Sequence, residues 1–207
     1  MEIIPIKYGE SFLPESAVFQ NGDEYKKRKI VFIVYLIKAD NRLILVDAGC
    51  ETMPGFELKN FIGVISALNK NNINPEMITD VIITHAHHDH IESIKHFNNA
   101  VVHIEKNEVE EAKKYIPDDF KVNVFDDSFS LLDNIHVLKI GGHSKGSCVV
   151  EIEGYKRMYV IIGDECYSRE CITKKIPTGW SYCPEKSKKF IDKYSSDKYV
   201  VLLCHDE

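Results

Sequence analysis

The residues with the clearest capacity for chemistry lie in the run HAHHDH at positions 85–90. An apolar stretch that predicts a strand precedes it, and side chains two apart on a strand, here His85 and His87, point to the same side. If the chain then turns into a helix, Asp89 and His90 lie in its first turn. Imidazoles and carboxylates bind zinc, iron and manganese, whereas a structural zinc site normally uses cysteines. Two pairs of such ligands favour two adjacent metal ions.

Three further ligand-type residues follow apolar stretches later in the chain. His143 lies in a glycine-rich segment, Asp164 follows an apolar run, and His205 comes two residues before the last residue of the sequence. Functional side chains concentrate on loops at the ends of strands, so we expect these three to meet the HAHHDH run at one edge of the fold. A lone histidine is more often structural than a ligand, but chance explains the shared placement of all these residues poorly. The set therefore predicts a metal site.

Histidines without this placement are expected to be structural. His88 should point away from its neighbours in the run. Cys204 should face the opposite side from His205, because adjacent residues on a strand alternate. The other histidines outside the predicted site are His96, His103 and His136.

Apolar patterning indicates the elements that would position these residues. Short apolar runs predict strands, and apolar residues at steps of three and four predict helices. The expected strands are Ile30–Ile37, Leu43–Val46, Asp80–Thr84, Ala100–Ile104, Lys121–Phe125, Arg157–Ile162 and Lys198–Cys204, with hairpin turns at 39–42, 133–134 and 153–154. The expected helices cover about 57–70, Val109–Ile116 and a segment from Pro184 that turns Phe190, Ile191 and Tyr194 inward. Residues 1–29 are expected to be mostly loop.

Each half of the chain combines strand hairpins with helices. This order favours an α/β fold in which two mixed β-sheets pack face to face and helices cover them outside. We expect one domain over residues 1–207, because a chain of this length can bury roughly 70% of the surface that its unfolded form exposes.

Composition and charge argue against several classes of function. Hydrophobic residues make up 44% of the chain and charged residues 28%, as in ordinary globular proteins. The net charge of −6 disfavours nucleic acid as a partner, and the basic run Lys26–Lys29 is expected to be a solvated loop. The longest apolar run is too short to cross a bilayer and no signal peptide is visible, which predicts a cytoplasmic protein without membrane contact. The six cysteines are expected to be free thiols.

The four motifs around residues 85–90, His143, Asp164 and His205 together resemble the metallo-β-lactamase superfamily. The likeness runs from the segment LVDAG (45–49) onward. It implies the αββα sandwich of that family and two divalent metal ions, with zinc expected and iron or manganese as alternatives. It also implies one metal on His85, His87 and His143, a second on Asp89, His90 and His205, Asp164 as a bridge, and Asp47 as a support that does not bind metal.

Within this superfamily the sequence looks most like the N-acyl-homoserine lactone lactonases. Those enzymes carry a tyrosine beside the bridging aspartate, and Tyr167 in the segment DECY matches it. The resemblance implies a hydrolase in which a hydroxide between the two metals attacks the carbonyl of a small lactone, ester or similar substrate. Tyr167 would then donate a hydrogen bond to the carbonyl oxygen, and Asp89 would move the proton to the leaving group. A packing role for Tyr167 stays open.

Departures from the family pattern concern the pocket walls and not the ligands. Ile91, Glu92 and Ser93 follow the cluster where small residues are usual, and Gly142 replaces a common proline. A thioesterase resembling hydroxyacyl-glutathione hydrolase is the first alternative, although those enzymes add a helical C-terminal domain that we do not expect here. A non-enzymatic metal- or ligand-binding member of the fold is the second. The sequence leaves the substrate and any assembly into a homo-oligomer open.

Overall fold

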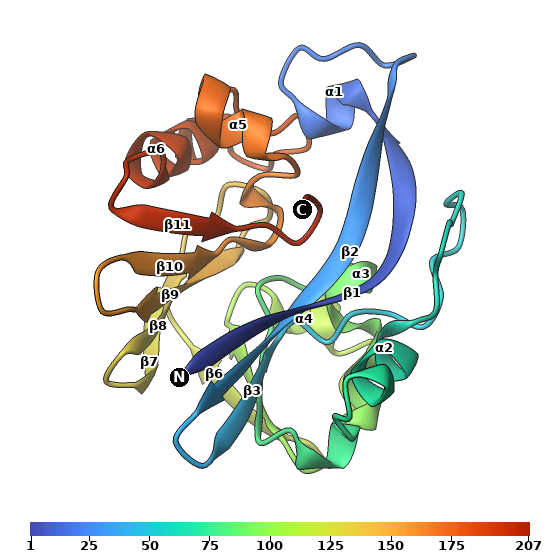
Figure 1. The fold of residues 1–207 in the computed structure, drawn as a ribbon, viewed down its shortest axis with the longest axis vertical. Coiled ribbons are helices and arrows are strands. Elements are labelled where there is room, and N and C mark those ends of the chain that lie inside the picture. The colour runs from blue at the N-terminus through green and yellow to red at the C-terminus, as the bar shows by residue number, and fades with distance from the viewer.

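The two longest strands, β1 (Glu2–Pro14) and β2 (Lys27–Ala39), form an antiparallel ribbon at the N-terminal end of the chain. The structure, a computed structural model, describes residues 1–207, and the ribbon curves along one side of it (Figure 1). A tight turn leads from β2 into β3 (Arg42–Val46). Asp40 in this turn has a φ of 51°, the left-handed conformation that tight hairpins require. The hairpin expected at 39–42 is confirmed.

Six strands form the first sheet, in the order β1-β2-β3-β4-β5-β6. The first three are antiparallel neighbours, whereas β4, β5 and β6 run parallel to β3. Parallel neighbours need long crossover connections, and these connections carry helices of the first half. The three parallel strands are β4 (Asp80–Ile82), β5 (Val101–Glu105) and β6 (Lys121–Phe125).

Five strands form the second sheet, in the order β11-β10-β9-β8-β7. Four of them are antiparallel neighbours, and β11 joins the edge parallel to β10. Both sheets are therefore mixed, as expected. The strands are β7 (Ser128–Leu132), β8 (Ile135–Lys139), β9 (Cys148–Glu153), β10 (Met158–Ile161) and β11 (Tyr199–Leu202).

Helices lie on the outer sides of the two sheets, with α5 and α6 beside β11 and α2 beside the first sheet (Figure 1). None of them is both long enough and apolar enough to cross a membrane. The helices are α1 (Glu15–Val18), α2 (Val64–Lys70), α3 (His88–Ile91), α4 (Val109–Ala112), α5 (Arg169–Lys174) and α6 (Pro184–Tyr194), with single 3₁₀ segments η1 (Pro75–Met77), η2 (Glu92–His96) and η3 (Gly163–Glu165).

Two apolar cores lie on the two faces of the strands. In β3, Ile44 and Val46 pack between the sheets, against residues such as Val150 of the second sheet. The residue between them, Leu45, belongs to the other core, which includes Leu68 of α2. Side chains alternate between the faces of a strand, and here both faces are covered. Burial on both faces explains why these strands read as continuous apolar runs in the sequence.

The expected loop over residues 1–29 is wrong for much of that range. Glu2–Pro14 form β1, whose order comes from pairing with β2 and not from a local pattern. Pro5 is compatible with this strand because β1 lies at the sheet edge, where a missing N–H need not interrupt the ladder. The basic run also differs, because β2 begins at Lys27 and the exposed Lys29 lies on that strand.

The helix expected over 57–70 covers only the second half of that range, as α2. Residues 57–63 run beside β1 instead, where the backbone of Lys59 pairs with β1. Left-handed φ angles at Asn60 (49°) and Gly63 (74°) interrupt any helix here. The apolar residues recur at helical spacing, but the backbone of this segment forms hydrogen bonds with β1 and not within a helix.

Two smaller differences concern helices near the ends of strands. The helix expected over Val109–Ile116 stops at Ala112 and continues as turns. The short helix α5 has no counterpart among the expected elements; it begins after Ser168, whose hydroxyl accepts the Glu170 N–H. The C-terminal helix agrees with expectation, because α6 buries Phe190, Ile191 and Tyr194.

Candidate metal centre

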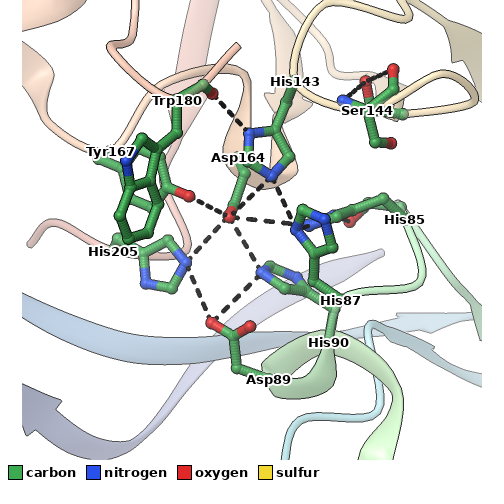
Figure 2. A network of polar contacts seen from close by, with 12 residues as sticks. His85, His87, Asp89, His90, His143, Ser144, Asp164, Tyr167, Trp180 and His205 are labelled. Carbon is green, nitrogen blue, oxygen red and sulfur yellow. Dashed lines mark hydrogen bonds and ion pairs between the residues drawn. The ribbon is translucent and has the colours of Figure 1, made fainter. Parts of the chain in front are cut away.

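The predicted ligands come from five loops or short helices, and Figure 2 shows their side chains pointing toward one another. The first histidines follow β4, and α3 carries the next two ligands on its single turn. The loop between β8 and β9 brings in the fourth histidine, η3 an aspartate, and the segment after β11 the last histidine. The structure brings together all seven predicted ligands, His85, His87, Asp89, His90, His143, Asp164 and His205.

One group of ligand atoms gathers around His87. Its Nδ1 lies 3.0 Å from Nε2 of His85 and 2.9 Å from Nε2 of His143. Oδ2 of Asp164 lies 3.7 Å from Nε2 of His85 and 3.4 Å from Nε2 of His143. Three ring nitrogens and one carboxylate oxygen thus point at a common centre, with the ligand atoms within 4.8 Å of one another.

A second group gathers on the other side of Asp164. Its Oδ1 lies 3.0 Å from Nε2 of His90 and 2.9 Å from Nε2 of His205. Oδ2 of Asp89 lies 3.7 Å from the first of these nitrogens and 3.6 Å from the second. The two oxygens of Asp164 therefore face different groups, which is the arrangement that a bridging carboxylate needs.

The chemistry of the centre fits divalent cations. Nε2 of His90, Nε2 of His205 and Oδ1 of Asp164 are buried and have no hydrogen-bond partner. A buried polar atom without a partner costs free energy, and such atoms are rare in native proteins. Here the three atoms point into one common space, where a cation would satisfy all of them. The donor set, with imidazole and carboxylate and no thiolate, suits zinc and also iron or manganese.

Hydrogen bonds on the far side of the ring orient three of the histidines. Nδ1 of His90 donates to Oδ2 of Asp47 at 2.7 Å. Nδ1 of His143 donates to the backbone oxygen of Trp180, and Nδ1 of His205 to that of Val31, both at 2.9 Å. With the proton held on Nδ1, each Nε2 presents its lone pair to the centre.

Asp47 also holds the strand end that carries the first ligands. Its Oδ1 accepts the backbone N–H of Thr84 at 2.7 Å, and its Oδ2 accepts the Thr84 hydroxyl at 2.9 Å. The residue is buried and has a left-handed φ of 64°. Asp47 thus lies where the sequence places it, in contact with a ligand and outside the cluster.

Burial and neighbouring charges set the protonation of the centre. Burial lowers the pKa of His85 well below its usual 6.5, which keeps that ring neutral. Burial alone would raise the pKa of Asp164, but the surrounding histidines, His90 foremost, hold it well below 3.8. Burial would likewise lower the pKa of His90, yet Asp164 and Asp47 raise it well above 6.5. Without a cation, the Asp164 carboxylate is therefore ionised and compensated by positive charge on His90, and a bound cation would replace the proton on Nε2 of that ring.

A cavity of about 370 Å³ opens onto both ligand groups. Asp89, Asp164 and Tyr167 face it, and the half-exposed Trp180 stands at its wall. The sequence pattern did not identify most of its apolar lining, because the lining residues come from β1, β2 and the loop after β3. These residues are Leu13, Ile30, Phe32, Met53 and Phe56.

Tyr167 lies directly against the centre. Its hydroxyl donates to Oδ2 of Asp164 at 2.8 Å, and its ring stacks on His205 with ring centroids 5.1 Å apart. The side chain is almost fully buried yet lines the cavity. Figure 2 shows the hydroxyl directed at the ligands and not at the surrounding core.

The remaining histidines lie outside both ligand groups. His88 is half-buried, and its Nε2 donates to the backbone oxygen of Thr52 at 2.9 Å. His103 is buried and donates to Asp80, and His136 bonds to Ser130 on an exposed part of the second sheet. His96 is exposed in η2, and Cys204 packs in the core between the sheets.

Two buried carboxylates beside the ligands have no signal in the sequence motifs. Glu108 and Glu165 are both buried and accept hydrogen bonds from the loop that carries His143. Burial raises the pKa of Glu165 to about 7. Position offered the only hint for Glu165, since it follows Asp164 directly. Glu108 lies in a polar stretch that reads as solvated.

Comparisons with known sequences agree on one family. A model of the metallo-beta-lactamase superfamily matches residues 34–189. A probable metallo-hydrolase of Methanocaldococcus jannaschii is 32% identical over 165 residues, which cover 79% of this chain and 70% of that protein. A hydroxyacylglutathione hydrolase of Pectobacterium atrosepticum is 28% identical over 182 residues, which cover 84% of this chain and 61% of that enzyme. The chain thus matches less than two thirds of the latter enzyme's length.

A solved structure extends the likeness to the fold. An N-acyl homoserine lactone hydrolase, with the product N-hexanoyl-L-homoserine bound at its catalytic metal center, superposes with a TM-score of 0.86. The superposition covers 99% of this chain and 92% of that chain, at 20% sequence identity. At this low identity, the superposition shows the shared fold alone, that is, the arrangement of two sheets and flanking helices.

Proposed function

This chain belongs to the metallo-beta-lactamase superfamily of metal-dependent hydrolases, and we propose that its substrate is a small lactone or a related ester. One observation carries the proposal. Two groups of ligand atoms share Asp164 beneath a largely apolar cavity, and Asp89 and Tyr167 face the same space. Such a cavity suits an apolar substrate whose carbonyl is directed at the metal ligands.

We assign zinc to the centre, with one ion at His85, His87 and His143 and the other at Asp89, His90 and His205. Both ions would touch Asp164. When bound, two such cations supply Lewis-acid activation of water and of the substrate carbonyl. The imidazole and carboxylate donors, together with the orientation of the His90, His143 and His205 rings by their second nitrogens, support this assignment.

The protein's own side chains then perform two separate tasks. The Tyr167 hydroxyl donates to Asp164 before substrate binds. It then donates to the carbonyl oxygen of the substrate instead, as negative charge develops there. Asp89 lines the cavity beside His205, so its carboxylate accepts a proton from the attacking water and returns it to the leaving oxygen. Burial of Tyr167 raises the pKa of its hydroxyl well above 10, so it serves as a hydrogen-bond donor and stays protonated.

The cavity wall supplies the binding energy for the rest of the substrate. Met53 and Phe56 come from the loop after β3, and Phe32 from β2. Each buried CH₂ of an acyl chain contributes about 0.8 kcal/mol, so affinity should rise with chain length until the cavity is filled.

A substrate panel tests the proposal. Protein loaded with zinc is assayed on acyl lactones of increasing chain length, simple esters and acyl thioesters. His87→Ala should lose metal and activity, whereas Tyr167→Phe should keep both metals and lose about 10²–10³-fold in kcat. The exposed His96→Ala serves as the matched control and should behave as the wild type. Protein that binds two metals and hydrolyses no member of the panel would overturn the proposal.

A thioesterase is the second candidate. The likeness to a hydroxyacylglutathione hydrolase favours it, although the match covers 61% of that enzyme. The thioester arm of the same panel decides between the two. A thioesterase should have a clearly higher kcat/KM for acyl thioesters than for lactones and esters, and a lactonase a clearly lower one. A binding protein without catalysis is disfavoured, because an open cavity reaches the ligands whereas structural metal sites are closed by protein.

A further inference from the structure

The loop that carries His143 lies between two buried carboxylates. Glu108, just before α4, is 5% exposed, and Glu165 of η3 is fully buried. Neither belongs to the two groups of ligand atoms. A carboxylate is rarely buried unless donors or cations compensate it, so the partners of these two residues indicate what they do.

Glu108 connects two ligand loops to each other. Its Oε2 accepts the backbone N–H of Ala86 at 2.9 Å, and Ala86 stands between the ligands His85 and His87. Its Oε1 accepts the backbone N–H of Gly146 and the hydroxyl of Ser144, both at 2.7 Å. One oxygen thus holds the first ligand loop and the other oxygen holds the His143 loop.

Glu165 holds the His143 loop from the other side. Its Oε1 accepts the hydroxyl of Ser147 at 2.6 Å and the backbone N–H groups of Gly142 and His143 at 3.2 and 3.3 Å. Because Glu165 follows Asp164, these bonds fix the loop relative to the carboxylate between the two ligand groups.

The loop approaches both carboxylates too closely for larger residues. A Cβ at Gly142 would lie 2.3 Å from Oε2 of Glu165, and a Cβ at Gly146 would lie 2.9 Å from Cγ of Glu108. The same Gly146 Cβ would lie 2.4 Å from Oε2 of Glu105. The glycines therefore permit the backbone N–H groups to reach their acceptors.

We propose that Glu108 and Glu165 are positioning residues that clamp residues 141–147 so that Nε2 of His143 meets the ring nitrogens of His85 and His87. The clamp spans three ligand-bearing segments with two side chains. It leaves the orientation of His143 to be completed by its Nδ1 bond to Trp180. The inference rests on the metal centre of the proposed function and is independent of the substrate.

Replacement of Glu108 by glutamine tests the clamp at a single atom. A carboxylate accepts hydrogen bonds at both oxygens, whereas an amide accepts at one and donates at the other. Whichever way the amide turns, its NH₂ faces either the Ala86 N–H or the donors of Gly146 and Ser144. Glu108→Gln therefore releases one of the two ligand loops with almost no change in side-chain volume.

Metal binding to Glu108→Gln is measured with the apoprotein. Zinc affinity is determined by competition with a chelating dye, and the visible absorption of bound Co²⁺ reports the ligand geometry. Circular dichroism and thermal melting of the apoprotein report folding independently of metal. Glu110→Gln is the matched control, because Glu110 lies in α4 with an 87% exposed side chain that contacts Lys113 only.

The clamp predicts a 10- to 100-fold loss of affinity for one zinc ion in Glu108→Gln, about the effect of removing other residues that orient metal ligands. The Co²⁺ spectrum should change, the apoprotein should stay folded, and Glu110→Gln should match the wild type. Unchanged affinity and spectrum in a folded Glu108→Gln would overturn the inference. A wild type that binds no metal would instead overturn the metal centre itself.

A milder pair of variants decides the matter if Glu108→Gln does not fold. Ser144→Ala removes one donor to Glu108, and Ser147→Ala removes the shortest bond to Glu165. Each should weaken zinc binding less than Glu108→Gln is expected to, and shift the Co²⁺ spectrum in the same direction as the other. If both variants fold and bind zinc like the wild type, the two carboxylates serve folding alone and the clamp is wrong.

Discussion

At the residue scale, the rings of His90, His143 and His205 each use one nitrogen for the metal centre and the other for the protein. The protein-side partners differ, since His90 has a carboxylate from Asp47 whereas His143 and His205 have backbone carbonyls. A carboxylate partner binds the Nδ1 proton more strongly than a neutral carbonyl does. The His90 ring is therefore the one whose orientation depends most on a single removable side chain.

Asp47→Asn should weaken zinc binding by about 10- to 100-fold and lower activity, while the chain stays folded. Asn offers one acceptor, and Asp47 now serves three donors, from His90 and from the backbone and hydroxyl of Thr84. Zinc competition with a chelating dye measures the loss. Asp40→Asn, in the exposed turn after β2, is the control and should bind zinc normally. Equal affinity in both variants would contradict the role of Asp47.

The ligands could be predicted from the sequence because each follows an apolar run that ends near the site. Glu108 and Glu165 could not, since their partners are mainly backbone N–H groups and serines of another loop, which leave no spacing in their own segment. Most residues of the cavity wall could not be predicted, for a related reason. Met53 and Phe56 lie on an irregular loop, where no periodicity predicts which side chains face the ligands.

At the element scale, hydrogen bonds to one buried carboxylate join three neighbouring strands, β3, β4 and β5. Asp80 of β4 is buried, and its Oδ1 and Oδ2 accept hydrogen bonds from Arg42 of β3 at 2.8 and 2.9 Å. His103 of β5 donates to the same carboxylate at 2.9 Å. Burial alone would raise the pKa of Asp80, but the bonds from His103, Thr79 and Arg42 hold it below its usual 3.8. The network thus links adjacent parallel strands through one ionised group.

Asp80→Asn should lower the free energy of unfolding at pH 7 by about 1–3 kcal/mol, because a buried donor loses its acceptor. A folded pKa below the unfolded value stabilises the protein above about pH 4, and this contribution is lost as the pH falls toward the folded pKa. The gap between wild type and variant should therefore shrink below pH 4. Urea unfolding at several pH values measures it, with the exposed Asp133→Asn as control. A gap that stays constant down to pH 3 would contradict the role of the ionised group.

Strands and hairpins were predictable wherever the apolar run was buried on both faces, as in β2, β3 and β10. The N-terminal strand was not, because β1 owes its order to pairing with a later strand, from Pro14 opposite Lys27 to Glu2 opposite Lys38, and Pro5 reads locally as a loop signal. The segment 57–63 shows the opposite error. Its apolar spacing fits a helix, but backbone bonds to β1 and the left-handed Asn60 override that local preference.

At the scale of the whole molecule, the metal centre joins the two sheets. The loop after β4 and α3 supply four ligands from the side of the first sheet, and the other three come from loops of the second sheet. Backbone bonds from Val31 and Ile33 of β2 to the residues after β11 cross the same boundary. In the absence of cations, the ligand groups contribute to this junction only through the contacts of the ionised Asp164 with the histidines around it.

Removal of the metal should therefore lower the melting temperature of the entire protein. A cation that binds only the folded state stabilises it by about 2.7 kcal/mol when its free concentration is 100 times Kd. For a chain of this length that amounts to a decrease of about 5–10 °C on chelation. Calorimetry with and without a chelator measures the shift, and added zinc should restore it. His205→Ala should show a smaller shift, because one of its two ligand groups is incomplete. Hydrogen exchange should rise first in the ligand loops, since these connect the sheets. An unchanged melting temperature after verified metal removal would contradict the conclusion that the metal centre joins the two sheets.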